Sequence, residues 1–196
     1  MTVPGTFDTS ARELIHAGLQ NLDEARSLFR QLSASGFDAA RCGLLLDALQ
    51  HVCDPDVALR NLVDIVNAQV SQGRALDDIM PDDTAFRQLV AVLGVSDAMG
   101  KLMRFRPDLV QAAATDHCNS HLYNHDQRRA HVLESVGADP NDRMSPTATM
   151  DLADAATALR RTYRNQLAAI IAQDTMSDDP IALQPRIKIG RASCRE

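Results

Sequence analysis

The segment "LGVSDAMGKLMRF" (residues 93–105) contains a glycine followed by a Gly-Lys pair, as phosphate-binding loops do. Such a loop needs Gly, four residues, Gly-Lys and then Ser or Thr, because backbone N–H groups surround the phosphates and the hydroxyl binds Mg²⁺. Here five residues separate Gly94 from Gly100, and Leu102 stands where the hydroxyl belongs. We therefore interpret the segment as a turn between helices. Gly94 closes one helix, Ser96 caps the next, and Gly100 permits close helix approach.

Three histidines, His117, His121 and His125, are spaced four residues apart and would share one face of a helix. Imidazoles at this spacing can bind Zn²⁺. However, the intervening Asn and Ser residues disfavour a helix, and no carboxylate stands where a metalloprotease motif has its base. Zn²⁺ binding is kept as an alternative, and no residue is assigned as a metal ligand.

Asp54 and Asp56 form an Asp-x-Asp pattern, with which nucleotidyltransferases hold Mg²⁺. Pro55 lies between them, and a helical repeat of apolar residues follows. Because proline suits the first turn of a helix and aspartate is a good N-cap, this arrangement favours a cap over a metal site.

An anion-binding helix face is conceivable at Arg160, Arg161 and Arg164. Arginines at such spacing on a surface helix are more often solvated or paired with carboxylates. We therefore interpret them as an ordinary polar face.

The elements expected to position these residues are helices, because apolar residues recur with a period near 3.6 and no strand alternation competes. Turn formers predict irregular connections at residues 114–127 and 137–147. The predicted fold class is all-α, an antiparallel helical array or bundle with no sheet. The predicted helices cover about residues 22–35, 38–52, 54–70, 82–93, 126–136 and 147–174. In the last helix one apolar side is expected to comprise Leu152, Ala155, Ala156, Leu159, Tyr163, Leu167 and Ile170.

Composition excludes several classes of function. The chain of 196 residues has a formal charge of -6 and no basic cluster that could follow a phosphate backbone, which argues against nucleic-acid binding. It contains no apolar run of membrane-spanning length and no signal-peptide pattern at its start, so we expect no membrane partner and a cytoplasmic location.

The four cysteines, Cys42, Cys53, Cys118 and Cys194, show no CxxC spacing. The first two fall within apolar helical patterns, which predicts buried free thiols and no disulfide.

Three stretches in order resemble the bifunctional glutamine synthetase adenylyltransferase/adenylyl-removing enzymes, also called glutamate-ammonia-ligase adenylyltransferases. The second stretch is the most specific, because the family typically has a helix ending Leu-Gly-x-Ser, then small or apolar residues with Gly, then a basic residue before Pro and an acid. The stretches are "DPDVALRNLVDIV" (54–66), "FRQLVAVLGVSDAMGKLMRFRPDLV" (86–110) and "LRRTYRNQLAAIIAQD" (159–174) followed by "DPIALQPRI" (179–187).

The resemblance implies reversible transfer of AMP to a glutamine synthetase tyrosine, with ATP and Mg²⁺, under the control of nitrogen status. Glutamine synthetase, a nitrogen-signalling regulator and the rest of its own chain are the implied partners. Residues 1–187 would be the N-terminal helical region that precedes the adenylyl-removing nucleotidyltransferase domain. The fragment itself would be non-catalytic, with neither ATP nor Mg²⁺ bound, and would pack against that domain.

The chain departs from the family pattern at Lys101 and at Phe105-Arg106, where relatives tend to carry Asp and Arg-His. The Gly-rich strand and acidic pair of the catalytic domain do not follow Ile187, so no catalytic, cofactor-binding or metal residue is assigned.

Residues 188–196, "KIGRASCRE", abandon the helical pattern and resemble a translated sequencing adapter, so we predict a non-native tail there. A genuine flexible basic tail is the alternative. The alternative function is a stand-alone helical interaction module, or, less favoured, a Zn²⁺-binding helical protein.

Overall fold

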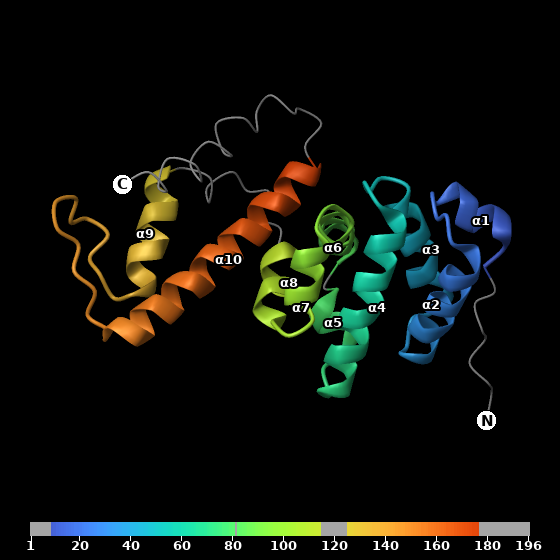
Figure 1. The fold of residues 1–196 in the computed structure, drawn as a ribbon, viewed down its shortest axis with the longest axis horizontal. Helices are drawn as coiled ribbons and strands as arrows, with labels where there is room; N and C mark the ends of the chain where they lie inside the picture. The colour runs from blue at the N-terminus through green and yellow to red at the C-terminus, as the bar shows by residue number, and fades with distance from the viewer. Residues whose placement is uncertain (1–8, 81, 115–124, 177–196) are drawn as a thin grey trace.

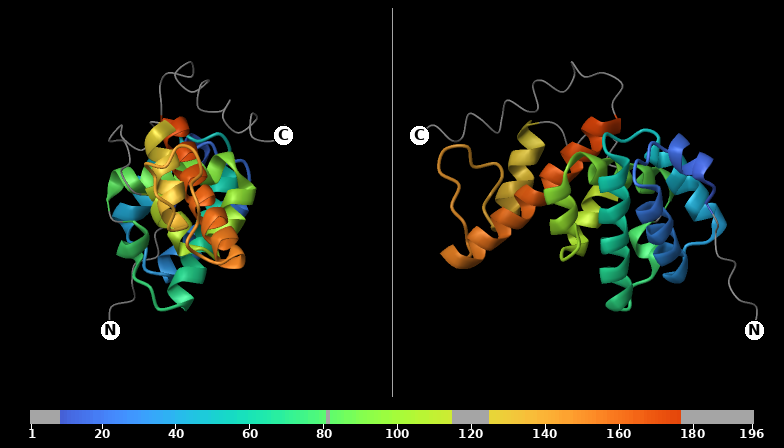
Figure 2. Two further views of the ribbon diagram at one scale, coloured as in Figure 1. Left: turned by 90° about the vertical axis from the view of Figure 1, so that its left-hand side faces the viewer. Right: turned by 45° about the vertical axis from the view of Figure 1, so that its right-hand side comes forward.

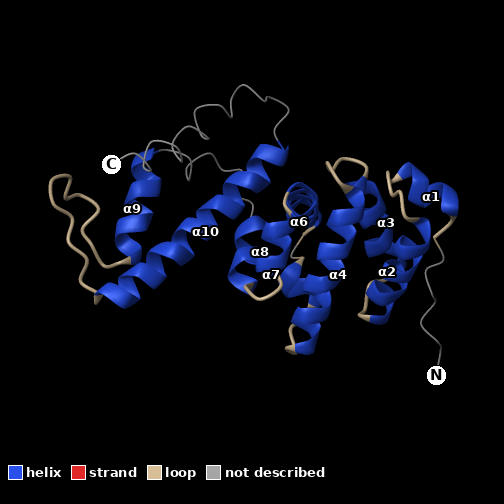
Figure 3. Ribbon diagram, in the orientation of Figure 1, coloured by secondary structure: helices blue, strands red, loops and turns tan. Residues whose placement is uncertain are grey.

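A computed structural model describes residues 9–80, 82–114 and 125–176. These residues form helices and contain no strand (Figure 3), so the predicted all-α fold is confirmed. The antiparallel order of neighbouring helices stays a prediction. The helices are α1 (Ala11–His16), α2 (Leu22–Ala34), α3 (Ala39–Leu49), α4 (Pro55–Ser71), α5 (Leu76–Ile79), α6 (Asp83–Val95), α7 (Asp97–Met103), α8 (Pro107–Ala114), α9 (His125–Ser135) and α10 (Leu152–Met176).

The helices follow one another along the molecule, with α1 to α4 at one end and α9 at the other (Figure 1). Helix α10 runs diagonally between α9 and the α6–α8 group (Figure 1). The right-hand view of Figure 2 shows α10 between the same neighbours. The main core joins side chains from α1 to α8 with the second half of α10, through Ala168 and Ala172. A second, small core comprises Val136, Ala138 and Ala155 at the α9–α10 end.

Side-chain caps fix most helix starts where the sequence predicts them. Asp38, Asp54, Asp82 and Ser96 each accept a hydrogen bond from the backbone N–H three residues further on. These bonds satisfy N–H groups that the first turn of a helix leaves without a partner. The predicted end of α2 is also confirmed, because Gly36 has a φ of 105°, a conformation that favours glycine.

The prediction that Gly94 closes a helix is wrong. Helix α6 continues through Gly94 to Val95, and Ser96 both ends α6 and caps α7. A Cβ atom at Gly94 would lie 2.9 Å from Cβ of Val52 and 3.3 Å from the carbonyl oxygen of Asp54. The glycine therefore serves close packing inside the helix, with no change of backbone direction.

Gly100 does permit the predicted close approach of two helices. It lies on α7 against α4, and a Cβ atom there would be 2.3 Å from Cγ of Asn61. Asn61 is only 5% exposed, and its Nδ2 donates a hydrogen bond to the carbonyl oxygen of Leu93 at 3.2 Å. One buried side chain of α4 therefore touches both α7 and the end of α6.

Helix α10 begins at Leu152, later than the predicted start near Thr147. The reason is a cap: the carboxylate of Asp151 accepts hydrogen bonds from the N–H groups of Ala153 and Asp154, both at 2.9 Å. Residues 137–151 form the irregular connection that the turn formers predict, whereas the other predicted loop lies mostly outside the described residues.

The predicted apolar side of α10 is only partly buried. Ala155 is buried, but Leu152, Leu159 and Tyr163 are 88%, 40% and 61% exposed. The sequence pattern assumes one continuous partner, whereas α10 packs against three helices, α9, α6 and α8. Its Ala155 lies in the small core, and its Ala168 and Ala172 lie in the main core. The buried positions are Ala155, Thr162, Ala168 and Ala172.

Two cysteines lie in the described residues, and both are free. Cys42 is buried as predicted, but Cys53 is exposed, because α3 ends at Leu49 and Cys53 falls in the turn before α4. Cys118 and Cys194 lie outside the described residues. Within the described part, no helix has the length and apolar content that crossing a membrane requires. The cytoplasmic location stays a prediction.

Replacing Gly100 with Ala is expected to destabilise the chain by about 1–3 kcal/mol, as overpacked sites do. The added methyl group overlaps Asn61, which cannot turn away without losing its bond to Leu93. Gly43→Ala in α3 is the matched control, because no atom lies within 4 Å of the point where its Cβ atom would stand. In the control, the free energy of unfolding should rise by about 0.5–1 kcal/mol, because alanine has less backbone freedom to lose on folding than glycine. Urea unfolding measures both, and equal changes would contradict the packing argument.

Candidate functional site at the start of α4

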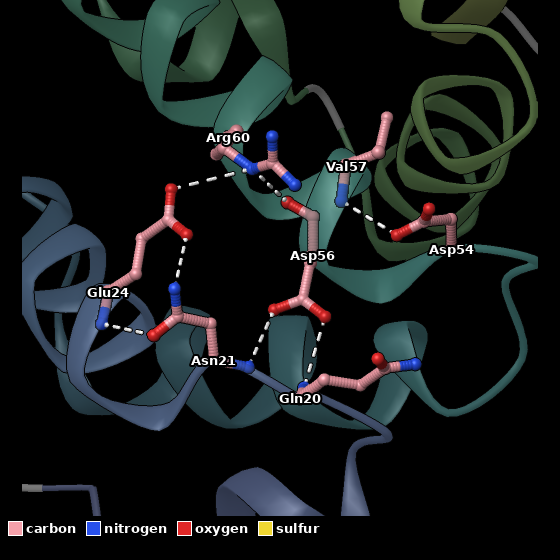
Figure 4. Close-up of polar contacts among 7 residues, drawn as sticks. All are labelled: Gln20, Asn21, Glu24, Asp54, Asp56, Val57 and Arg60. Carbon is pink, nitrogen blue, oxygen red and sulfur yellow. Dashed lines mark hydrogen bonds and ion pairs between the residues drawn. The ribbon is translucent and has the colours of Figure 1, made fainter.

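The Asp-x-Asp pair lies in the first turn of α4, on either side of Pro55 (Figure 4). Oδ1 of Asp54 accepts a hydrogen bond from the N–H of Val57 at 3.0 Å. The favoured interpretation of Asp54 as a helix cap is confirmed by this bond.

Asp56 joins α4 to a distant part of the chain. Its Oδ2 accepts a hydrogen bond from the N–H of Gln20 at 3.0 Å, and its Oδ1 accepts one from the N–H of Asn21 at 3.3 Å. The two carboxylates of the pair thus face different backbone segments, as Figure 4 shows. This arrangement holds the connection between α1 and α2 against the start of α4.

Glu24 and Arg60 complete the cluster. Oε2 of Glu24 accepts from Nδ2 of Asn21 at 3.0 Å, and its Oε1 lies 3.5 Å from Nε of Arg60. Arg60 Nε also donates to the carbonyl oxygen of Asp56 at 3.2 Å. The side chains surround an open hollow of about 260 Å³, lined by Gln20, Asn21, Glu24, Asp54, Asp56 and Arg60.

The chemistry of this hollow is that of a structural junction. Its carboxylates are used as caps and ion-pair partners, and a guanidinium group lies among them. Across the described ranges, no three His, Cys, Asp or Glu side chains are arranged to hold a metal ion. Of the three histidines, His125 belongs to the described residues; it is exposed, and its Nδ1 lies 3.6 Å from Oδ1 of Asp126. His117 and His121 lie outside the described residues.

The glycine-lysine segment at residues 93–105 is the end of α6, a one-residue junction and α7. Oδ2 of Asp97 lies 2.7 Å from Nζ of Lys101, one helical turn later. Ser96 Oγ accepts from the N–H of Met99 at 3.2 Å, so the predicted cap is confirmed. The helix–turn–helix interpretation is therefore confirmed, and the lysine is paired within its own helix.

Asp108 is paired with two arginines, an interaction that sequence reasoning missed. Arg106 Nε and Nη2 donate to its two carboxylate oxygens at 3.0 and 2.8 Å. Arg161 Nε of α10 donates to Oδ2 at 3.0 Å. The hydrogen bond from Arg106, followed by the positive charges of both arginines, lowers the pKa of Asp108 to about 2. This residue therefore ties α8 to α10, and Arg161 is ion-paired as the polar-face interpretation expects.

Comparison with known proteins identifies relatives of one kind. The chain is 61% identical over 181 residues to a bifunctional glutamine synthetase adenylyltransferase/adenylyl-removing enzyme of Bifidobacterium longum (strain DJO10A). That match covers 92% of this chain and 17% of the relative. A protein with the same name from Corynebacterium efficiens is 33% identical over 187 residues, which covers 77% of this chain and 17% of the relative.

These matches confirm the family resemblance that the three sequence stretches indicate. The chain spans about 17% of the length of the curated relatives that it matches. No protein-family model and no solved structure matches it.

Asp108→Asn is expected to destabilise the chain by about 1–3 kcal/mol near neutral pH, because charged hydrogen bonds are lost. The pKa of Asp108 is lower in the folded chain, so its stabilisation is present above about pH 4 and is lost as pH falls toward 2. The two proteins should therefore converge in stability over that range. Urea unfolding at several pH values measures this. The exposed control is Asp23→Asn. The expectation would be contradicted if the difference in free energy of unfolding between the unmodified chain and Asp108→Asn did not change with pH, or if it equalled the difference that the control shows.

Replacing Asp54 with Ala is expected to lower the free energy of unfolding by about 1 kcal/mol, because the helix cap is lost. Asp54→Asn should lower it little, because asparagine also caps helices. Asp56→Ala should speed hydrogen exchange at the amides of Gln20 and Asn21, which lose their acceptor. Thermal unfolding and exchange mass spectrometry measure these effects. If Mg²⁺ raised the unfolding temperature of the unmodified chain but not of Asp54→Asn, the pair would be a metal site.

Proposed function

We propose that this chain, which is related over most of its length to bifunctional glutamine synthetase adenylyltransferases, forms their N-terminal helical region. The supporting observation is high identity over nearly the whole chain together with coverage of only 17% of the relative. Residues 1–187 would precede the adenylyl-removing nucleotidyltransferase domain. Residues 188–196 lie outside the described residues, and their assignment as a non-native tail belongs to this proposal.

The fragment itself is proposed to be non-catalytic. Nucleotidyl transfer needs carboxylates that converge on Mg²⁺, and the Asp-x-Asp pair at Asp54 and Asp56 is committed to a helix cap and to the α1–α2 connection. The chain would therefore act as a scaffold that packs against the catalytic domain and fixes its position.

The proposed activity belongs to the whole enzyme. It would transfer AMP from ATP, with Mg²⁺, to a tyrosine of glutamine synthetase and remove it again according to nitrogen status. The relatives' name states glutamine synthetase as the protein acted upon. A nitrogen-signalling regulator is the second proposed partner.

The alternative is a stand-alone helical interaction module. It is favoured by the continuous core from α1 to α8, which needs no further domain to bury it. A Zn²⁺-binding helical protein using His117, His121 and His125 is the weaker alternative. Zn²⁺ titration of the chain against a His121→Ala variant distinguishes it.

The test is a chimera in which residues 1–187 replace the matching segment of the Bifidobacterium longum enzyme. We expect the chimera to transfer AMP to glutamine synthetase and to remove it, whereas the isolated chain does neither. Incorporation of labelled AMP from ATP, and its release, measure both reactions. An enzyme with the segment deleted is the control.

AMP transfer by the isolated chain would contradict its non-catalytic role. A folded chimera that is as inactive as the deletion control would contradict the family role. In that case the stand-alone module would be the better account.

A further inference from the structure

The first half of α10 exposes large apolar side chains along one face. Leu152, Leu159 and Tyr163 are 88%, 40% and 61% exposed. Their spacing of seven and four residues places them within about 40° of one another around the helix axis, at 3.6 residues per turn. We call these three residues the α10 stripe.

Neighbouring helices leave the α10 stripe uncovered. Helix α9 and the residues after it pack on a different side of α10, where Val136 and Ala138 meet Ala155. The second half of α10 packs into the main core through Ala168 and Ala172. Figure 1 shows that the first half extends beyond α8, beside α9. From the first half of α10 the small core therefore buries Ala155, whereas the larger side chains of the α10 stripe remain in solvent.

Positive charge borders the stripe on the side away from α9. Arg160 and Arg164 are one turn apart there, and neither has an ion-pair partner in the structurally described part of the chain. Arg161, further round the helix, is engaged by Asp108. These two arginines are available to a partner, in a chain whose formal charge is -6.

This charge pattern disfavours a second copy as the occupant. A two-fold antiparallel pairing of α10 stripes brings the same edge of each helix together, so Arg160 and Arg164 would face the arginines of the other copy. A parallel pairing would bring the arginine edge to the opposite edge of the stripe, where α9 already packs. The charges instead suit a segment with apolar residues bordered by carboxylates.

We infer that the α10 stripe docks an acidic-edged amphipathic segment from the part of the adenylyltransferase that lies outside this chain. The inference rests on the proposed function, which makes this chain one part of a longer enzyme. The matched relatives are long enough to supply such a segment, because this chain corresponds to only 17% of their length. Apolar contact would give affinity, and Arg160 and Arg164 would fix the orientation.

The first measurement is hydrogen exchange at α10 in the isolated chain and in the chimera that carries residues 1–187. Amides of residues 152–164 should exchange about tenfold more slowly in the chimera, because docking suppresses local opening. Leu159→Gln with Tyr163→Gln should abolish this protection. Ile15→Gln is the matched control, since Ile15 is 62% exposed on α1 at the other end of the molecule. Neither variant should change the unfolding temperature of the isolated chain appreciably.

A second variant tests the charges. Arg160→Glu with Arg164→Glu should weaken the protection of α10, and added salt should weaken it in the unmodified chimera. Light scattering should find the isolated chain monomeric. A dimer that disappears in the stripe variant would overturn the inference in favour of a second copy.

Equal exchange in the chimera and the isolated chain would also overturn the inference. If that chimera still transfers AMP, the docking surface fails while the proposed function stands. If the chimera is folded but inactive, the proposed function fails as well.

Discussion

The close contact between α4 and α7 at Asn61 and Gly100 is the constraint on which much of the fold depends. Because Gly100 has no side chain, α7 reaches the buried amide of Asn61, which also binds the carbonyl of Leu93 at the end of α6. Helix α7 ends at Met103, three residues after this contact. Asp108 follows in α8 and accepts hydrogen bonds from Arg106 and from Arg161 of α10. The close approach at Gly100 therefore lies on the route by which α4, α6 and α7 lead to α8 and α10.

Local signals in the sequence are sufficient for much of the fold, because a cap acts within one turn. Asp54 with Pro55 shows the start of α4, and Ser96 shows the start of α7. The short helix α1 was missed although Ser10 and Glu13 form a capping box, a pattern that could have revealed it. Gly94 was misread because a glycine suits both a helix end and a tight helix contact, and only the neighbour at Val52 decides between them.

In the candidate site, too, contacts between residues close in sequence could be predicted, whereas contacts between distant residues could not. The cap formed by Asp54 follows from adjacent residues, but the bonds from Gln20 and Asn21 to Asp56 join positions 36 and 35 residues apart. The bond between Arg161 and Asp108 spans 53 residues. No periodicity in the sequence encodes such partners. The exposed side of α10 was missed for a related reason, because a helical repeat indicates an apolar face but not which neighbours cover it.

The length of α10 has a mechanical consequence. Its 25 residues span about 38 Å, and one half is embedded in the main core while the other half extends beyond it. Such a helix is a lever whose pivot lies near Arg161, where the bond to Asp108 attaches it to α8. A partner that displaces the outer half would therefore also load the attachment to α8, because both lie on one continuous helix.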